Sequence, residues 1–151
     1  LFGASMRVGG CINNRSKKEK EALESFGRNL GICFQITDDI LDYSSKEKVF
    51  GKKIGNDFLE GKITLPIILL FQKSNKIERQ MLNKFFTQNS RNQDDFQKIV
   101  GLIDKHKIIE ICKKRADYFS NVAADSLSIF EKNFTIEKLQ ELSFYIVNRL
   151  N

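Results

Sequence analysis

Residues 16–44 decide the fold, and they read SKKEKEALESFGRNLGICFQITDDILDYS. The opening SKKE has the pattern of a capping box, in which an N-cap hydroxyl and a glutamate three residues later each bond the other's backbone N–H. Apolar residues then recur at helical spacing, at Leu23, Phe26, Leu30, Phe34, Ile40 and Leu41. The pattern predicts one long helix from Ser16 to about Ser44.

The whole chain has the composition of an all-α protein. Its 151 residues are 41% hydrophobic, which is enough for the core of one domain. One proline and nine glycines leave few helix breakers and little turn chemistry for an all-β chain. Besides the long helix, we expect a short apolar helix that Thr64 caps and helices at residues 76–87, 94–104, 107–132 and 136–150, the last with Thr135 as N-cap.

Two further features concern packing. Up to Asn13 the chain should form a helix in which Gly3, Gly9 and Gly10 allow another helix to approach closely. Aromatic residues of the later helices are expected in the core, and these are Phe96, Tyr118, Phe119, Phe130 and Phe144.

The formal charge of +6 comes from 25 Lys and Arg against 19 Asp and Glu, spread along the chain without a compact basic arm. We therefore expect no nucleic acid among the partners. The three cysteines form no CxxC pair and there is a single histidine, which argues against a zinc site and a full disulfide framework. Such thiols are typical of a reducing compartment, so the expected localisation is cytoplasmic. The longest apolar run, residues 65–71, is far shorter than the about twenty residues of a membrane span.

The residues that carry chemistry lie at the end of the long helix, at positions 34–42 (FQITDDILD). At about 100° per residue, Gln35, Asp38 and Asp42 fall on one face, and Asp39 lies beside them. Asp38 and Asp42 are only about 6 Å apart along the axis, and like charges this close repel unless a cation joins them. Carboxylates without histidine or cysteine suit Mg²⁺, which is commonly held by one or two carboxylates and substrate phosphates.

The alternative is a solvated acidic end of a surface helix. The aspartates are interleaved with isoleucine and leucine, however, which indicates that most sides of this helix are buried. Carboxylates on a buried helix need a partner. The pattern therefore favours a metal site at Asp38, Asp39 and Asp42.

A glycine-rich segment follows the aspartates and supplies positive charge. It reads GKKIGND at residues 51–57 and GKITLP at residues 61–66, so that Lys52, Lys53 and Lys62 lie on glycine-hinged backbone. The segment is no Walker A loop, because GxxxxGK[ST] is absent. Carboxylates for Mg²⁺ together with ammonium groups for phosphate oxygens describe a diphosphate site.

These motifs, FQxxDDxxD, GKxxGxD and GKxTLP, resemble those of the trans-isoprenyl (polyprenyl) diphosphate synthase family. The version in this chain is most similar to long-chain, octaprenyl-type members. The resemblance implies an all-α isoprenoid synthase helical bundle, of which residues 1–151 would be the C-terminal portion of a single domain. The family's first aspartate-rich motif would then lie upstream of Leu1, and we expect the chain alone to make no product.

The resemblance also implies roles for individual residues. Asp38, Asp39 and Asp42 match the second aspartate-rich motif, which holds Mg²⁺ at the allylic diphosphate. Gln35 matches a glutamine near that diphosphate and the reacting carbon. Phe34 matches an aromatic residue that lines the pocket of the isopentenyl unit.

The lysines complete the implied site. Lys52, or Lys53 because spacing in this loop varies, matches a diphosphate-binding lysine, and Lys62 matches another. The residues expected to act in catalysis are Gln35, Asp38 and Lys52. The sequence departs from the family pattern at Leu59, where a basic residue often stands, and at Asn56, where an acid is common.

The implied reaction is a Mg²⁺-assisted, head-to-tail condensation of isopentenyl diphosphate onto an allylic diphosphate of the farnesyl type. The product would be an all-trans polyprenyl diphosphate, a ubiquinone precursor that partitions to the membrane. A homodimer is expected. The alternative is a non-catalytic subunit of the same fold that dimerises with an active partner, but the retained glutamine, aspartates and lysines favour the enzyme.

Overall fold

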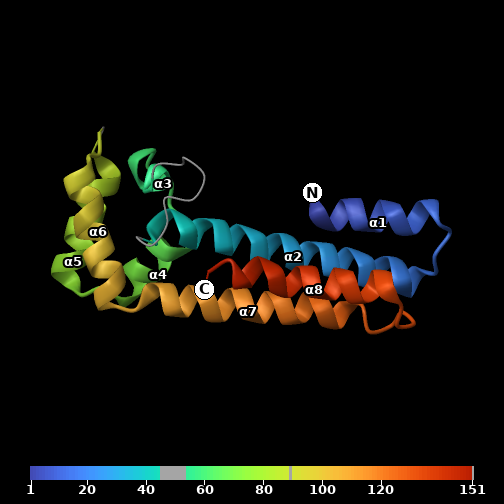
Figure 1. The fold of residues 1–151 in the computed structure, drawn as a ribbon. Coiled ribbons are helices and arrows are strands. Elements are labelled where there is room, and N and C mark those ends of the chain that lie inside the picture. Colours follow the sequence, from blue (N-terminus) through green and yellow to red (C-terminus); the bar gives the residue numbers. More distant parts are fainter. Residues whose placement is uncertain (45–53, 89, 151) are drawn as a thin grey trace. The chain divides into compact units, whose positions relative to one another are not determined.

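The computed structural model describes residues 1–44, 54–88 and 90–150, and within these ranges the chain forms helices and no strands. The helices are α1 (Phe2–Ile12), α2 (Lys17–Tyr43), α3 (Asn56–Leu59), α4 (Leu65–Lys73), α5 (Lys76–Thr87), α6 (Gln93–Lys105), α7 (Ile108–Ser126) and α8 (Phe134–Asn148) (Figure 1). The predicted all-α class is confirmed. No helix in the described part of the chain is both long and apolar enough to cross a membrane.

The chain divides into two compact units. The first consists of residues 1–37 and 113–151, and the second consists of residues 38–112. The first unit therefore contains α1, α8 and most of α2 and α7, whereas the second contains α3 to α6. The predicted aspartates belong to the second unit.

Helix α2 begins as the sequence predicts. The Ser16 hydroxyl accepts a hydrogen bond from the Glu19 N–H at 3.3 Å, and the Ser16 N–H donates to Glu19 Oε2 at 2.8 Å. Hydrogen bonding of the Glu19 carboxylate to the Ser16 side chain and to the Ser16 N–H favours the charged form and lowers the pKa of Glu19. The helix ends at Tyr43, one residue before the predicted end.

In the first unit, α1 packs against α2 at glycines. A Cβ atom on Gly27 would lie 2.6 Å from the Phe2 carbonyl oxygen and 2.8 Å from Met6 Cγ, so the two backbones approach as closely as they can. Gly3 and Gly10 face α2 as expected, but Gly9 does not, because a Cβ there would meet nothing within 4 Å. An ion pair between Arg7 and Glu24 also joins the two helices.

Hydroxyl groups connect α7 to its neighbours in the first unit. The Ser126 Oγ lies 2.8 Å from the Ser25 Oγ on α2, and the buried Ser120 hydroxyl donates to the Ser143 carbonyl of α8 at 2.8 Å. Small buried residues of α7, such as Ala116 and Ala123, allow this close packing. The buried face of α7 in this unit is thus lined with small side chains.

The boundary between α7 and α8 differs from the prediction. Helix α7 ends at Ser126 instead of residue 132, because the chain tightens into turns in which the Leu127 N–H bonds the Ala124 carbonyl at 3.1 Å. These turns bury Leu127 completely. Helix α8 begins at Phe134, and its N-cap is Asn133, whose side chain accepts from the Ile136 N–H at 3.0 Å. The expectation that Thr135 is the N-cap is wrong.

The expectation that the later aromatic residues all lie in the core is also wrong. Phe96 is 2% exposed, but Tyr118 is 63% exposed and Phe144 is 43% exposed. The buried face of α7 contains Ala116 and Ser120, and Tyr118 lies about 200° around the helix from Ala116. Phe119 and Phe130 are partly buried.

In the second unit, an aromatic cluster surrounds α3. The fully buried Phe58 ring lies edge-on to the rings of Phe85 and Phe86, with centroids 6.1 and 5.7 Å away. Its centroid lies 6.0 Å from that of Phe96, which in turn contacts Tyr43 at the end of α2. This cluster attaches the short helix α3 to α5 and α6.

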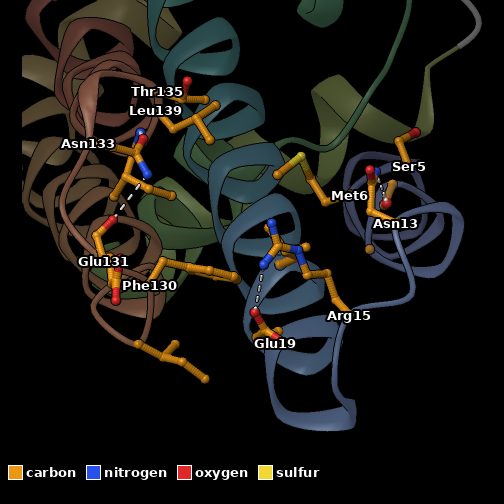
Figure 2. A pocket seen from close by; sticks show the side chains of 15 residues that line it. Ser5, Met6, Asn13, Arg15, Glu19, Phe130, Glu131, Asn133, Thr135 and Leu139 are labelled. Carbon is orange, nitrogen blue, oxygen red and sulfur yellow. Dashed lines mark hydrogen bonds and ion pairs between the residues drawn. The ribbon is translucent and has the colours of Figure 1, made fainter.

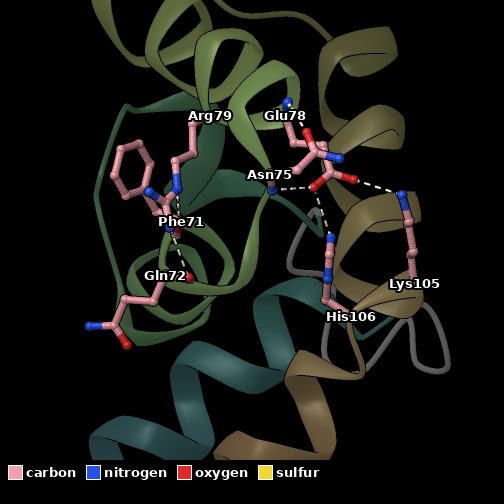
Figure 3. A network of polar contacts seen from close by, with 7 residues as sticks. All are labelled: Phe71, Gln72, Asn75, Glu78, Arg79, Lys105 and His106. Atoms are coloured by element: carbon pink, nitrogen blue, oxygen red, sulfur yellow. Dashed lines mark hydrogen bonds and ion pairs between the residues drawn. The ribbon is translucent and has the colours of Figure 1, made fainter.

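A polar network joins α5 to α6 in the same unit (Figure 3). Asn75 and Glu78 form a capping box at the start of α5. The buried Glu78 carboxylate also accepts a hydrogen bond from Lys105 Nζ at 2.7 Å, and its Oε2 lies 3.0 Å from His106 Nε2. The bond from Lys105 contributes most to lowering the pKa of Glu78 from 4.5 to about 2.

We expect Gly27→Ala to destabilise the first unit. The new methyl group would collide with the Phe2 carbonyl of α1, and overpacking of this kind costs about 1–3 kcal/mol. Urea denaturation followed by circular dichroism measures the effect. The control is Gly9→Ala on α1, which has open space and should stabilise its helix by about 0.5–1 kcal/mol. Equal effects of the two substitutions would contradict the close approach at Gly27.

We expect Glu78 to make the free energy of unfolding depend on pH in the acidic range. Its folded pKa is below the unfolded value, so its contribution is complete above pH of about 4.5 and is lost as the pH falls to about 2. The difference in the free energy of unfolding between wild type and Glu78→Gln should therefore shrink over this interval. Denaturation at a series of pH values measures it, with exposed Glu131→Gln as the control. A difference that stays constant with pH would contradict the network.

Candidate functional site

The three predicted metal ligands lie in the last turns of α2, within the second unit. Asp38 and Asp42 are half-buried, and Asp39 is 6% exposed. Phe34 and Gln35 precede them on α2 but belong to the first unit, where both are exposed.

Asp42 binds the start of α3. Its Oδ1 accepts a hydrogen bond from the Asn56 N–H at 3.2 Å, and its Oδ2 accepts one from the Asp57 N–H at 2.9 Å. The Asp42 carbonyl oxygen also accepts from the Gly55 N–H at 3.0 Å. Burial raises the pKa of the Asp42 carboxyl, and the bond from the Asp57 N–H opposes that rise. The carboxylate thus occupies the position of a side-chain cap on α3.

Gly55 makes this arrangement possible. Its φ of +86° lies in the left-handed region, which side chains other than glycine rarely adopt. A Cβ there would lie 2.8 Å from the Phe96 ring, so the backbone passes directly over the aromatic cluster.

Asp39 binds the start of α4 in a similar way. Its Oδ2 accepts a hydrogen bond from the Leu65 N–H at 3.4 Å. Thr64 is the N-cap residue, as predicted, and Pro66 lies in the first turn, but the Thr64 side chain makes no capping bond. The acceptor comes instead from the carboxylate on α2. The sequence predicted the place of this cap but not its chemistry.

Lys62 lies just after α3 and pairs with carboxylates. Its Nζ lies 2.7 Å from Glu60 Oε2 and 3.1 Å from Asp57 Oδ1. The bond to Glu60 contributes most to raising the pKa of Lys62. Sequence reasoning quoted Asp57 within the GKxxGxD motif and assigned it no role, and it did not single out Glu60.

A second cation lies near Lys62. The Arg91 guanidinium packs against Gly61, where a Cβ would lie 2.7 Å from Arg91 Nη1, and it stacks over the Phe86 ring at 5.6 Å. Gly61 has a φ of +79°, a left-handed conformation that favours glycine. Arg91 is thirty positions from Gly61 in the sequence, and no local pattern indicates the contact.

The structure describes only part of the predicted diphosphate site. Lys52 and Lys53 lie outside the described residues. Among residues 1–44, 54–88 and 90–150, no three His, Cys, Asp or Glu side chains are close enough together to hold a metal ion. The assignment of Asp38, Asp39 and Asp42 as a shared ligand set therefore stays a prediction. Unlike the side chains of Asp39 and Asp42, the Asp38 side chain has no hydrogen-bond or ion-pair partner among the described residues.

In the first unit, the Phe34 ring lies 6.0 Å from the Phe2 ring of α1. Gln35 lines a small cavity of about 350 Å³ together with Phe2, Glu24 and Arg28. The Phe34 ring and the Gln35 side chain thus lie beside the first turn of α1.

A larger groove of about 930 Å³ lies elsewhere in the first unit, between α1, the start of α2 and the turn before α8 (Figure 2). Its polar side chains are engaged locally. Arg15 pairs with Glu19 at 3.2 Å, and the Asn133 amide donates to the Glu131 carbonyl at 3.2 Å. None of the predicted site residues lines it.

Comparisons with known proteins agree with the motifs. The model of the polyprenyl synthetase family matches residues 1–103. The chain is 26% identical to an octaprenyl diphosphate synthase of Haemophilus influenzae over 99% of its own length and 45% of that protein. It is 32% identical to a geranylgeranyl diphosphate synthase of Saccharolobus solfataricus, with the same two coverages. The chain therefore spans about half the length of the relatives it matches.

Solved structures give the same result. A polyprenyl synthase of Caulobacter crescentus, in a crystal with calcium and isoprenyl diphosphate, superposes with a TM-score of 0.89 at 31% identity. The match covers 98% of this chain and 45% of that one. A decaprenyl diphosphate synthase of Rhodobacter capsulatus superposes with a TM-score of 0.87 at 29% identity. With the family model matching two thirds of its residues, the chain belongs to the polyprenyl synthetase family.

Proposed function

We propose that the protein containing this chain is a Mg²⁺-dependent prenyltransferase. It would condense isopentenyl diphosphate onto an allylic diphosphate of the farnesyl type to give an all-trans polyprenyl diphosphate. The observation that carries the proposal is an arrangement of charged residues in the second unit. Asp38 lies on α2, and the next two aspartates of α2 accept hydrogen bonds from the starts of α3 and α4. Lys62 lies on the segment between α3 and α4. Family membership and the names of the relatives support it.

The residues present fit a magnesium ion whose remaining ligands would come from the substrate. Their donors are carboxylate oxygens, and Mg²⁺ is usually held by one or two carboxylates together with phosphate oxygens. Fewer than three acidic groups converge within the described residues, which suits an ion that needs the diphosphate for its remaining ligands. Asp38 would hold the ion, with Asp39 and Asp42 beside it. When bound, the ion would neutralise charge on the departing diphosphate.

The chain's own residues would bind and orient the substrates. The Lys62 ammonium would hold diphosphate oxygens, and by resemblance so would Lys52 or Lys53. The bond between the allylic carbon and the diphosphate oxygen breaks, and the diphosphate leaves with the electron pair. The isopentenyl double bond then attacks the cation, and a proton is lost from the neighbouring carbon. By resemblance, Gln35 would lie near the diphosphate, and the Phe34 ring would face the isopentenyl unit, where an aromatic quadrupole favours positive charge.

We expect Asp38→Asn to lower turnover by about a hundredfold, the scale for removing one electrostatic stabiliser of a transition state. The assay supplies labelled isopentenyl diphosphate, farnesyl diphosphate and Mg²⁺ to the longest protein that contains this chain and measures label in extracted lipid. Asp104→Asn, at an exposed position of α6, is the control and should change little. Wild-type turnover in Asp38→Asn at saturating Mg²⁺ would contradict the assignment of Asp38. A wild-type protein that binds diphosphate and makes no product would support the non-catalytic alternative.

We expect Lys62→Ala to raise the KM for the allylic diphosphate by about tenfold or more, because a charge-assisted hydrogen bond to phosphate is lost. Initial rates at varied allylic diphosphate measure this effect. The matched control is Lys132→Ala, which removes an exposed ammonium from the turn before α8. If both variants weaken binding equally, general basicity and not a site attracts the substrate.

A further inference from the structure

Asp42 has a different set of contacts from Asp38, although both belong to the same aspartate motif. We infer that Asp42 acts as a positioning residue for the diphosphate site. Its carboxylate fixes the first turn of α3, and α3 fixes the ammonium of Lys62 through Asp57. The inference rests on the proposed function, since Lys62 is assigned to the diphosphate there.

The first step is the attachment of α3 to α2. Both carboxylate oxygens of Asp42 are engaged, one by the Asn56 N–H and the other by the Asp57 N–H. The Asp42 carbonyl oxygen accepts a hydrogen bond from the N–H of Gly55, the residue before Asn56. Hydrogen bonds from a helix's first N–H groups to a charged carboxylate are about twice as strong as neutral ones. Three consecutive residues are thereby fixed to one residue of α2.

The second step is that α3 depends on such anchors. It has four residues, and a helix this short does not form by itself because nucleation costs more than its few hydrogen bonds return. The buried Phe58 ring fixes one side of α3 in the aromatic cluster. Asp42 fixes its beginning. If only the Phe58 ring anchored α3, the N–H groups of Asn56 and Asp57 in its first turn would lack the acceptors that Asp42 supplies.

The third step carries the position of α3 to Lys62. Asp57 donates its N–H to Asp42 Oδ2 at 2.9 Å, and its carbonyl accepts from the Lys62 N–H at 2.8 Å. Its carboxylate lies 3.1 Å from Lys62 Nζ. One residue therefore contacts the anchor with its amide and the lysine with both its carbonyl and its side chain. A shift of Asp57 would move the Lys62 backbone and ammonium together.

Asp38 lies one turn earlier on α2 and has none of these contacts. We therefore assign Asp38 the role of metal ligand and Asp42 the role of positioning residue. A metal ligand and a positioning residue differ in what their loss changes. Loss of a ligand raises the Mg²⁺ concentration that activity needs. Loss of a positioning residue weakens diphosphate binding and leaves the Mg²⁺ requirement as it was.

The experiment compares Asp42→Asn with Asp38→Asn in the longest protein that contains this chain. An asparagine at position 42 keeps the shape of the side chain, but its NH₂ group would face a backbone N–H and lose one bond. Amide hydrogen exchange over residues 54–62 measures the attachment of α3. Calorimetry with inorganic diphosphate and Mg²⁺ measures binding, and initial rates measure kcat, KM and the Mg²⁺ midpoint. Asp57→Asn serves as a second variant that retains the N–H to Asp42.

For Asp42→Asn we expect faster exchange at the Asn56 and Asp57 amides and about tenfold weaker diphosphate binding, with kcat within about twofold of wild type and an unchanged Mg²⁺ midpoint. Asp57→Asn should weaken diphosphate binding with little change in exchange. Asp38→Asn should raise the Mg²⁺ midpoint and leave exchange unchanged.

The inference is overturned if Asp42→Asn raises the Mg²⁺ midpoint with unchanged exchange, because Asp42 is then a ligand. It is also overturned if exchange quickens while diphosphate affinity stays the same, because α3 then does not position Lys62. Failure of the proposed function looks different, since the wild-type protein would make no product. The exchange and calorimetry measurements would still test the role of Asp42.

Discussion

Two carboxylates at the end of α2 accept hydrogen bonds from the first N–H groups of two other helices, and the second unit depends on this constraint. Asp39 holds the start of α4, and Asp42 holds the start of α3. Taking a carboxylate out of water costs free energy unless hydrogen bonds compensate, and helix N-termini supply both N–H donors and a favourable dipole. The same contacts provide acceptors for backbone N–H groups at the starts of the short helices, which have no acceptor within their own helix. The aspartates therefore organise the polypeptide around the site as well as supplying its charge.

The features that the sequence predicted well are local. The capping box at Ser16 is an example, because its two residues are three positions apart. The features it did not predict depend on partners far along the chain. The Leu65 amide meets an aspartate twenty-six residues earlier, and Gly27 is required by a carbonyl on another helix. The prediction of Thr135 instead of Asn133 as N-cap was a local error, because both residues can cap and two positions separate them.

Lys62 illustrates how the site's charges can be exchanged. In the structure its ammonium pairs with Glu60 and Asp57 on an exposed segment. Exposed ion pairs of this kind contribute little to stability, because water and salt screen them. The proposed diphosphate substrate offers several charged oxygens and would replace the Glu60 carboxylate at small cost. The backbone bond from Lys62 to Asp57 does not involve the ammonium, so the lysine would keep its place while its partner changes.

The charged groups near the end of α2 bear on how the proposed metal ion and diphosphate would bind. Around the end of α2 the described residues contribute the carboxylates of Asp38, Asp39, Asp42, Asp57 and Glu60. Lys62 and Arg91 are the cations placed beside them in the described part of the chain. Among the described residues carboxylates therefore outnumber cations here, whereas Lys52 and Lys53, the other proposed diphosphate ligands, lie outside the described residues. On the proposed assignment, Mg²⁺ held by Asp38 would offset part of this negative charge for the diphosphate. Binding of the metal and of the diphosphate would then be coupled, because the ion and the diphosphate carry opposite charges.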